Sequence, residues 1–341
     1  MVKETDIVFS LLRGVLTGEE PKVREMDAQR WWSLFRLLQR NHVAALCFDS
    51  AAALLPRDVK MPWLAEREKA AEWHRYQQTV QDDLVERMRS HGIDTLVLKG
   101  THTARHYPKP ELREFGDLDL YFYDRHDEAD EVARQELGAT IATDSHHHTK
   151  YNYRGITVES HYDFLNTHYP PSNKRYEAIL KELSTLDSQR STFEVLFLLR
   201  HMGCHFAASR ITLRDLVDWT LTCRALHDKA DWDLVRQTMH DSGMEPFASA
   251  LDTIAERQLG LTLPFAPTGI SDADERLERD IIYGTVDDCT ADGLRRLRWK
   301  ATRWRSLAWK RRMVYSDSGA ALLLASLTSH AEKPRSILHK Q

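Results

Sequence analysis

Two aspartates one residue apart, Asp117 and Asp119, are the side chains of this sequence most clearly placed for chemistry. In a β-strand successive side chains point to opposite faces, so both carboxylates would share one face while Leu118, Leu120 and Phe122 share the other. Two carboxylates this close repel each other unless a cation lies between them, and oxygen ligands favour a hard divalent ion such as Mg²⁺ or Mn²⁺. The pair therefore predicts half of a metal site, although a solvated strand face would carry the same two residues.

A third carboxylate, Glu159, lies in a second strand-like segment that ends at His161. The same alternation places Glu159 and His161 on one face. If this strand lies beside the aspartate strand, three carboxylates meet in one pocket, and their repulsion in a low-dielectric cleft is best explained by bound metal. We therefore predict that Asp117, Asp119 and Glu159 are catalytic metal ligands.

Groups suited to phosphate lie upstream, in Lys99-Gly100-Thr101 and at Arg113. The first group follows an apolar run and precedes a short helix, and a glycine at such a turn lets backbone N–H groups approach phosphate oxygens. Lys99 adds a full positive charge there, and the guanidinium of Arg113 is a second candidate clamp.

Three consecutive histidines, His146, His147 and His148, lie in an expected strand. Alternation predicts that His146 and His148 share a face and that one of them contacts phosphate or base. An exposed polar hairpin would carry the same residues. We assign His148 to the substrate pocket, together with His161, which shares a strand face with Glu159.

A further pair, His201 and His205, lies four residues apart on an expected helix, with Asp215 and Asp218 following. This spacing would suit a helical His/Asp metal phosphohydrolase. However, no glutamate lies between the histidines as in the H-E-x-x-H pattern. We therefore favour a packing or substrate-pocket role for both.

The elements that must hold these residues change in character along the chain. Up to residue 91 the spacing is helical, with a long helix expected over 63–90 after a loop that contains Pro56 and Pro62, and ended by Gly92. Residues 92–170 predict strand, helix, strand, helix and hairpin, in that order, over 93–98, 101–107, the aspartate run, 125–137, and 147–153 with 156–161.

From residue 171 to 341 the chain is helical again, with a break at Gly260, Pro264, Pro267 and Gly269 and a helix capped by Ser271. The predicted fold is therefore α+β. A small mixed-sheet core over 92–170 lies between largely α-helical N-terminal (1–91) and C-terminal (171–341) regions.

The composition is that of an ordinary globular chain with a sizeable core, since 42% of its 341 residues are hydrophobic and 29% are charged. The net charge of −4 gives no global attraction to nucleic acid or anionic membrane. No stretch approaches the ~18 to 20 apolar residues of a membrane span, and we expect a cytoplasmic protein. Its four dispersed cysteines, Cys47, Cys204, Cys223 and Cys289, predict reduced thiols rather than disulfides or a zinc site.

A basic stretch with interleaved tryptophans extends from Arg295 to Arg312 and contains no acidic residue. Its cations could bind phosphates and its indoles could stack on bases, which would allow contact with an RNA acceptor. The same pattern suits a helix that packs its tryptophans, which we favour, a helix on a membrane surface, or a helix that covers the acidic cleft.

Together these motifs resemble the polymerase-β-type nucleotidyltransferase superfamily, in particular its branch of uncharacterised bacterial nucleotidyltransferases. The resemblance rests on residues 92–100, on Arg113 with Gly116-Asp117-Leu118-Asp119-Leu120, on the histidines through His148, and on Val158-Glu159-Ser160-His161. It continues in Leu213-Arg214-Asp215-Leu216-Val217-Asp218-Trp219 and Asp231-Trp232. One departure is that the superfamily's usual Gly-Ser is Lys99-Gly100 here, with Thr101 as the nearest hydroxyl.

The resemblance implies a two-metal transfer of a nucleoside monophosphate from an NTP such as ATP to a hydroxyl acceptor, with release of pyrophosphate. Asp117 and Asp119 would bridge Mg²⁺ (or Mn²⁺) ions, and Glu159 would hold the ion nearer the acceptor and help to deprotonate its hydroxyl. Lys99, Arg113 and the Gly100-Thr101 backbone would hold the triphosphate.

The acceptor stays open between a small molecule, a protein and an RNA, because such a site is grafted onto the fold. The alternative is a catalytically weak relative that senses nucleotides or acts as a scaffold.

Overall fold

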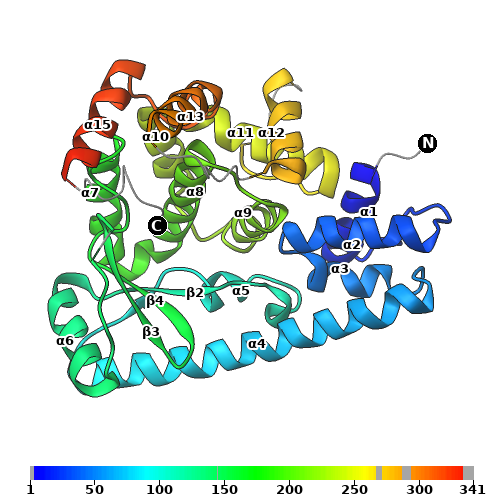
Figure 1. Ribbon diagram of the computed structural model, residues 1–341, viewed down its shortest axis with the longest axis horizontal. Coiled ribbons are helices and arrows are strands. Elements are labelled where there is room, and N and C mark those ends of the chain that lie inside the picture. The colour runs from blue at the N-terminus through cyan, green and yellow to red at the C-terminus, as the bar shows by residue number, and fades with distance from the viewer. Residues whose placement is uncertain (1–3, 144, 266–270, 286–292, 333–341) are drawn as a thin grey trace.

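The computed structural model describes residues 4–143, 145–265, 271–285 and 293–332. Helices surround one small mixed sheet, which confirms the predicted α+β class (Figure 1). The strands are β1 (Leu96–Val97), β2 (Asp117–Tyr121), β3 (His148–Tyr153) and β4 (Ile156–His161).

The helices before and within the sheet region are α1 (Glu4–Thr17), α2 (Ala28–Arg40), α3 (Ala44–Ala51), α4 (Arg57–Ser90), α5 (Thr101–Ala104) and α6 (His126–Leu137). Those after it are α7 (Asn173–Ser184), α8 (Arg190–Ala208), α9 (Leu213–Ala225), α10 (Trp232–Ser242), α11 (Glu245–Ile254), α12 (Asp272–Tyr283), α13 (Gly293–Ser306), α14 (Ala308–Val314) and α15 (Gly319–Glu332). Short 3₁₀ turns lie at Pro110–Leu112, Tyr123–Arg125 and Asp187–Gln189, and a π turn at Ala255–Leu259.

In the described residues the four strands form one sheet in the order β1-β2-β4-β3. The central strands β2 and β4 are parallel, whereas β1 with β2 and β3 with β4 are antiparallel. The parallel pairing puts Asp119 level with Glu159 and Asp117 level with Thr157. The expected order of strand, helix, strand, helix and hairpin is confirmed. The register of β2 and β4 brings the acidic residues to one face.

The two faces of the sheet differ in chemistry. One face packs against α4 and α6, and the residues of this core are Leu118, Leu120, Phe122, Tyr151, Tyr153, Ile156 and Val158 on or beside the strands, Val80, Leu84 and Met88 on α4, and Ala129 and Ala133 on α6. Figure 1 shows α4 along this side of the sheet and α7, α8 and α9 on the other. Because side chains alternate, burial of the apolar set turns the polar set toward α8 and α9.

Helix α4 begins at Arg57 rather than at the predicted residue 63, and Pro62 lies inside it rather than in a loop. A proline removes one helical hydrogen bond, but tertiary packing stabilises this end of the helix. Trp63 is fully buried, and its indole N–H donates to the Ala44 carbonyl at 2.8 Å. At the other end Gly92 has a φ of +69° and closes the last turn, as predicted for a glycine cap.

One hydrophobic core joins the N-terminal helices to the C-terminal ones, and it contains Trp31 as well as Trp219. Asn41 at the end of α2 links the two parts directly. Its amide donates to the Ile282 carbonyl at 3.0 Å, and its side-chain oxygen accepts from the Leu213 N–H at 3.3 Å. We therefore propose 1–91, 92–170 and 171–341 as regions of one packed body.

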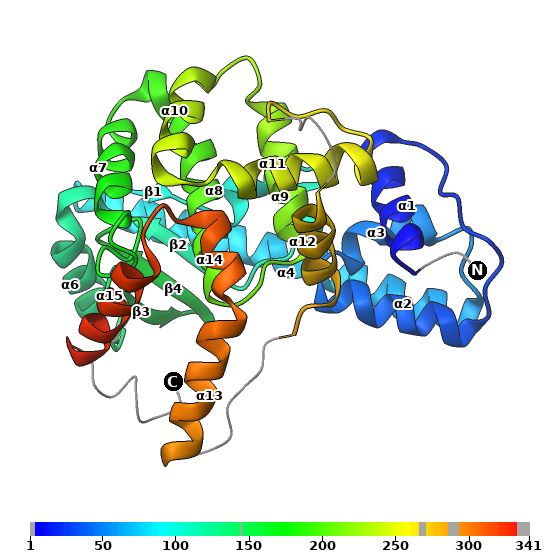
Figure 2. The ribbon, with the colours of Figure 1, turned by 90° about the horizontal axis from the view of Figure 1, so that it is seen from above.

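The basic stretch forms α13 and α14, of which α13 projects from the body (Figure 2). The buried Lys310 donates to the Ser209 carbonyl at 2.6 Å and pairs with Asp280 at 2.5 Å. Arg311 lies over the Trp304 ring, 3.8 Å from its centroid. These contacts confirm the packing role for the half of the stretch that contains Trp304, Lys310 and Arg311. Contact of the other arginines with RNA stays a prediction.

Ser271 caps α12 in a reciprocal pair with Asp274, as predicted. Cys47 and Cys223 are buried and free, and Cys204 is free and partly buried. Pro267, Gly269 and Cys289 lie outside the described residues. None of the helices in the described ranges has the length and apolar character needed to cross a membrane.

Candidate active site

A cavity of about 550 Å³ lies between the polar face of the sheet and helices α8 and α9. Asp117, Asp119 and Glu159 line its sheet side. The side formed by the turn after α8 and the start of α9 contributes Arg210 and Arg214. The sheet side therefore carries the three carboxylates with Lys99 and Lys150, and the helical side carries the two arginines with Asp215 and Asp218.

The carboxylates on β2 and β4 are held by neighbouring cations. Asp119 is only 2% exposed, and its Oδ1 lies 3.0 Å from Lys99 Nζ and 3.3 Å from His161 Nε2. Glu159 accepts from Lys150 at 2.7 Å, and its other oxygen lies 3.7 Å from His161 Nε2. β4 lies beside β2, which was the condition of the prediction, and their parallel register brings Glu159 beside Asp119.

These charges set the protonation of the groups. Burial alone would raise the pKa of Asp119, but Lys99 and His161 hold it well below its usual range. Burial also opposes the charged form of His161, yet its hydrogen bonds to the Asp119 and Glu159 carboxylates raise its pKa to about 9. Asp117 differs, because burial and the adjacent Asp119 charge both raise its pKa. A cation bound here would relieve that repulsion.

Possible metal ligands converge at this point of the sheet. Asp119, Glu159 and His161 each place one ligand atom within 4.8 Å of the other two. Among the described residues Asp117 does not join this group, although it lines the same cavity. Carboxylates suit hard divalent ions and imidazole suits transition metals. The donor set fits a divalent cation held by Asp119 and Glu159, with Asp117 beside them.

The Lys99-Gly100 turn lies at the edge of the cavity, and both residues line it. Gly100 has a φ of +66°, and a Cβ there would lie 3.1 Å from the Phe115 ring. The turn therefore needs glycine for its backbone angle and for the close approach of the ring. Thr101, whose backbone is predicted at the triphosphate, donates its side-chain hydroxyl to Gln81 of α4 at 2.6 Å.

Arg113, predicted as a phosphate clamp, is buried and paired. Its Nε and Nη2 each donate to Asp218 of α9 at 2.7 Å, and its Nη1 donates to the Gly100 carbonyl at 3.2 Å. Tyr107 donates to the same aspartate at 2.6 Å. The guanidinium borders the cavity, but these bonds commit it to holding the glycine turn against α9.

Two arginines that were not predicted as site residues line the cavity from its helical side, Arg210 in the turn after α8 and Arg214 in the first turn of α9. The Nε atoms of Arg210 and Arg214 are buried and have no partner among the described residues. Arg214 Nη1 donates to the Glu114 carbonyl at 3.1 Å, and Arg210 Nη2 donates to Asn41 at 3.2 Å. The sequence feature that could have pointed to them is the Thr212–Asp215 capping box, which marks the start of a helix beside both arginines.

The histidine run differs from the prediction. His147, rather than His146, joins His148 at the cavity. His146 stacks on His168 with ring centroids 4.5 Å apart. The strand begins only at His148, so strict alternation does not extend back through the bend before it. Burial lowers the pKa of His147 to about 2 and that of His148 to about 4, so both rings are neutral.

His201 and His205 line the cavity, which agrees with a pocket role. His201 Nε2 lies 2.9 Å from Lys99 Nζ, and the rings of His201 and His205 are in contact, with centroids 4.5 Å apart and planes inclined by 57°. The two aspartates that follow them in the sequence make other contacts, because Asp215 caps α9 and Asp218 pairs with Arg113. Within the described ranges neither histidine belongs to a group at metal-ligand spacing.

Comparison with known proteins identifies a family for this chain. The family described as "Uncharacterised nucleotidyltransferase" matches residues 27–260, more than half of the 341-residue chain. This match includes both walls of the cavity. A search of curated proteins found no match, and a search of solved structures found none either. The chain belongs to the family of uncharacterised nucleotidyltransferases.

Proposed function

We propose that this protein transfers a nucleoside monophosphate from an NTP to a hydroxyl acceptor and releases pyrophosphate. The observation that carries the proposal is the pairing of Asp119 with Glu159 on parallel strands, across a cavity from Arg210 and Arg214. The three carboxylates suit divalent cations, and the two arginines suit a triphosphate. Membership of a nucleotidyltransferase family supports the same reaction class.

Asp117, Asp119 and Glu159 would hold Mg²⁺ or Mn²⁺. When bound, such ions neutralise phosphate charge and stabilise the attacking and leaving oxygens. The acceptor oxygen bonds to the α-phosphorus while the bond from that phosphorus to the α,β-bridging oxygen breaks, and the bridging oxygen leaves with the electron pair in pyrophosphate. Glu159 is our candidate for taking the hydroxyl proton.

Lys99 would act in two states of the site. Without nucleotide its ammonium neutralises Asp119 at 3.0 Å. The flexible lysine stem lets the charge turn to a triphosphate oxygen once a divalent cation replaces it at the carboxylate. Arg113 would act differently, since its bonds to Asp218 and to the Gly100 carbonyl position the turn that carries Lys99.

We add Arg210 and Arg214 as candidate triphosphate ligands. Each keeps a buried Nε donor without a partner among the described residues. A buried donor left unpaired costs free energy, and phosphate oxygens would satisfy both. Their place opposite the carboxylates would set the β- and γ-phosphates against α9 and the α-phosphate toward β2 and β4.

The test uses NTPs labelled separately at the α- and γ-phosphate, with Mg²⁺ or Mn²⁺ and cell extract. The α label should enter an acceptor, or the protein itself, while the γ label leaves as pyrophosphate. Asp119→Asn should lower turnover by at least ~10³, about 4 kcal/mol. Asp127→Asn makes the same chemical change at a fully exposed carboxylate on α6 and should leave turnover unchanged. Near-normal turnover in Asp119→Asn, or transfer of the γ label, would contradict the proposal.

A nucleotide-binding protein without turnover is the second candidate, and one contact favours it. The Lys99 ammonium, 3.0 Å from Asp119, competes with a divalent cation for the same oxygen. Such a protein would be stabilised against melting by NTP with Mg²⁺, and the stabilisation would disappear without the metal. Transfer of the α label by the wild type would exclude it.

A further inference from the structure

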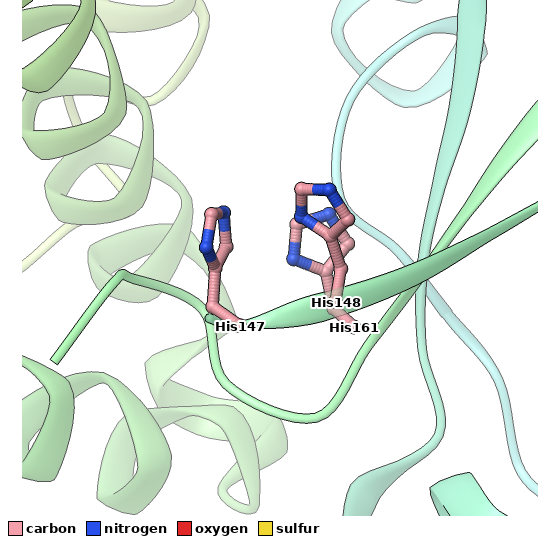
Figure 3. A group of neighbouring side chains, drawn as sticks. All are labelled: His147, His148 and His161. Atoms are coloured by element: carbon pink, nitrogen blue, oxygen red, sulfur yellow. The ribbon is translucent and has the colours of Figure 1, made fainter. Parts of the chain in front are cut away.

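Three histidines meet where β3 begins and β4 ends (Figure 3). His148 opens β3 and is the register partner of His161, the last residue of β4, and His147 directly precedes β3. One ring nitrogen of each lies within 4.8 Å of those of the other two. Figure 3 shows the three rings projecting to the same side of the sheet.

The contacts of these rings show which nitrogens an ion would use. His161 Nε2 lies 3.3 Å from Asp119 Oδ1, so an ion at this nitrogen would replace that contact and the proton it carries. His161 Nδ1 lies 3.2 Å from the Asp163 carbonyl, and His147 Nδ1 lies 3.2 Å from Ser145 Oγ. The buried Nε2 of His148 has no hydrogen-bond partner among the described residues. Histidines that bind metal commonly donate one ring N–H to an outer partner and offer the other nitrogen to the ion. The Asp163 carbonyl and Ser145 are suited to that outer role.

We propose that His147, His148 and His161 form a binding site for a transition-metal ion such as Zn²⁺ or Co²⁺. Imidazole nitrogens suit these metals, whereas Mg²⁺ prefers oxygen ligands. In a tetrahedral site with metal–nitrogen distances of about 2.0–2.1 Å, the nitrogens lie about 3.3 Å apart. Starting from separations of at most 4.8 Å, the rings need to approach by no more than about 1.5 Å.

Glu159 would supply a fourth ligand, because its Oε2 lies 3.7 Å from His148 Nδ1 and 3.7 Å from His161 Nε2. The site would thus adjoin the carboxylates proposed for Mg²⁺ without using Asp117. It would share Glu159 with them, but it does not depend on the proposed transfer reaction, since the three histidines define it. An ion there would add a positive charge beside the cavity.

The test is metal binding by the full chain, purified without a polyhistidine tag, stripped with chelator and loaded with Co²⁺ in the presence of excess Mg²⁺. The wild type should retain one Co²⁺ per chain and show the visible absorption of a nitrogen-ligated ion. His147→Gln should weaken Co²⁺ binding more than about tenfold, the lower end of the loss seen on removing an outer partner of a ligand. His147 is partly exposed, so this variant should fold, which its melting curve without metal checks.

Two matched variants separate this site from its neighbours. His146→Gln changes the adjacent histidine, whose ring stacks on His168 instead, and Asp117→Asn changes the carboxylate site. Both should bind Co²⁺ as the wild type does. Unchanged affinity in His147→Gln, displacement of Co²⁺ by Mg²⁺, or equal loss in Asp117→Asn would overturn the proposal. X-ray absorption of the Co²⁺-loaded wild type needs no substitution: three imidazoles are expected, and two or fewer would also overturn it.

Discussion

Asp119 has two cationic neighbours, Lys99 at 3.0 Å and His161 at 3.3 Å, although it is only 2% exposed. A buried carboxylate needs compensating charge, and here the chain itself provides it. Loading a divalent cation at Asp119 would then require the ammonium to move away. The two roles proposed for Lys99, at the carboxylate and at the triphosphate, can therefore be separated by measurement.

Lys99→Gln should raise the KM for NTP about tenfold, because a charged contact to the triphosphate of roughly 1.4 kcal/mol is lost. The same change should lower the Mg²⁺ concentration needed for half-maximal activity, because the competing ammonium is gone. Lys109→Gln makes the same change at an exposed lysine paired with Asp49 and should alter neither value. If Lys99 served Asp119 alone, the Mg²⁺ requirement would change without any change in KM.

Glu194 of α8 should make stability depend on pH in the acid range. It is held by Arg105, by His106 at 2.7 Å and by His102 at 3.2 Å, all from the segment around α5. Burial would raise its pKa, but the histidines and Arg105 lower it from 4.5 to about 2. Because the folded pKa is depressed, its contribution is full above the unfolded value and is lost as pH falls from about 4.5 toward 2.

Urea unfolding at pH 7 should show Glu194→Gln less stable than the wild type by about 3 kcal/mol, the equivalent of a shift of about 2.5 pKa units. The difference should narrow to about 1 kcal/mol at pH 3, where the unfolded glutamate is largely protonated. Glu182→Gln, at an exposed position on α7, should stay within about 0.5 kcal/mol of the wild type at both pH values. A difference that does not depend on pH would show that Glu194 acts through packing instead.

Alternation along strands was enough to pair Asp117 with Asp119 and Glu159 with His161, because a period of two is a local property. The prediction took the neighbouring position of the two strands as a condition, and only the structure shows that β4 lies beside β2. It could not find the partner of Arg113, because Asp218 lies 105 residues away and only tertiary packing brings it near. The prediction also placed His146 rather than His147 on the pocket face, because it assumed a strand that begins before His148. Local geometry was predictable here, and long-range pairing was not.

At the scale of elements, the connections on either side of β1 each depend on a glycine, Gly92 after α4 and Gly100 before α5. Gly92 and Gly100 both have positive φ, at +69° and +66°, and each could accept a methyl group only with backbone strain. They differ in surroundings. A Cβ at Gly92 would lie 3.5 Å from the Arg125 guanidinium, whereas one at Gly100 would lie 3.1 Å from the Phe115 ring.

Gly92→Ala should therefore cost about 1 kcal/mol of stability, the usual price of a left-handed residue. Gly100→Ala should cost more, about 2–3 kcal/mol, because its ψ of −116° and the Phe115 ring add strain. Urea denaturation of both variants checks the order. The Gly100 variant should also raise the KM for NTP, since the turn carries Lys99. Equal destabilisation of the two variants would contradict this account of the turn.

Helix boundaries were less predictable than helix identity. The glycine cap at Gly92 and the Ser271 cap follow from local hydrogen bonding, and both are confirmed. The start of α4 was misplaced because Pro62 favours a break, whereas burial of Trp63 and its bond to Ala44 keep the chain helical. Packing outweighs local propensity at that position.

At the scale of the molecule, one core unites regions that the sequence pattern separates. Trp31 from the N-terminal region and Trp219 from the C-terminal region lie in the same core, together with Tyr121 of β2. The sheet buries one face on α4 and α6, and its polar face closes the cavity against α8 and α9. The carboxylates thus keep their geometry only while both sets of helices are in place.

This arrangement predicts a single cooperative unfolding transition. Residues 92–170 contain no tryptophan, so tryptophan fluorescence reports on the helical regions, while hydrogen exchange of Leu120 and Val158 reports on β2 and β4. Asn41→Ala removes bonds made only between helical parts and should cost about 1–3 kcal/mol, because it leaves buried polar groups unpaired. If the molecule unfolds as one unit, the free energy of unfolding from fluorescence and the free energy of exchange of the strand amides should fall by the same amount. A shift in fluorescence with unchanged exchange of the strand amides would instead mark the sheet region as an independent folding unit.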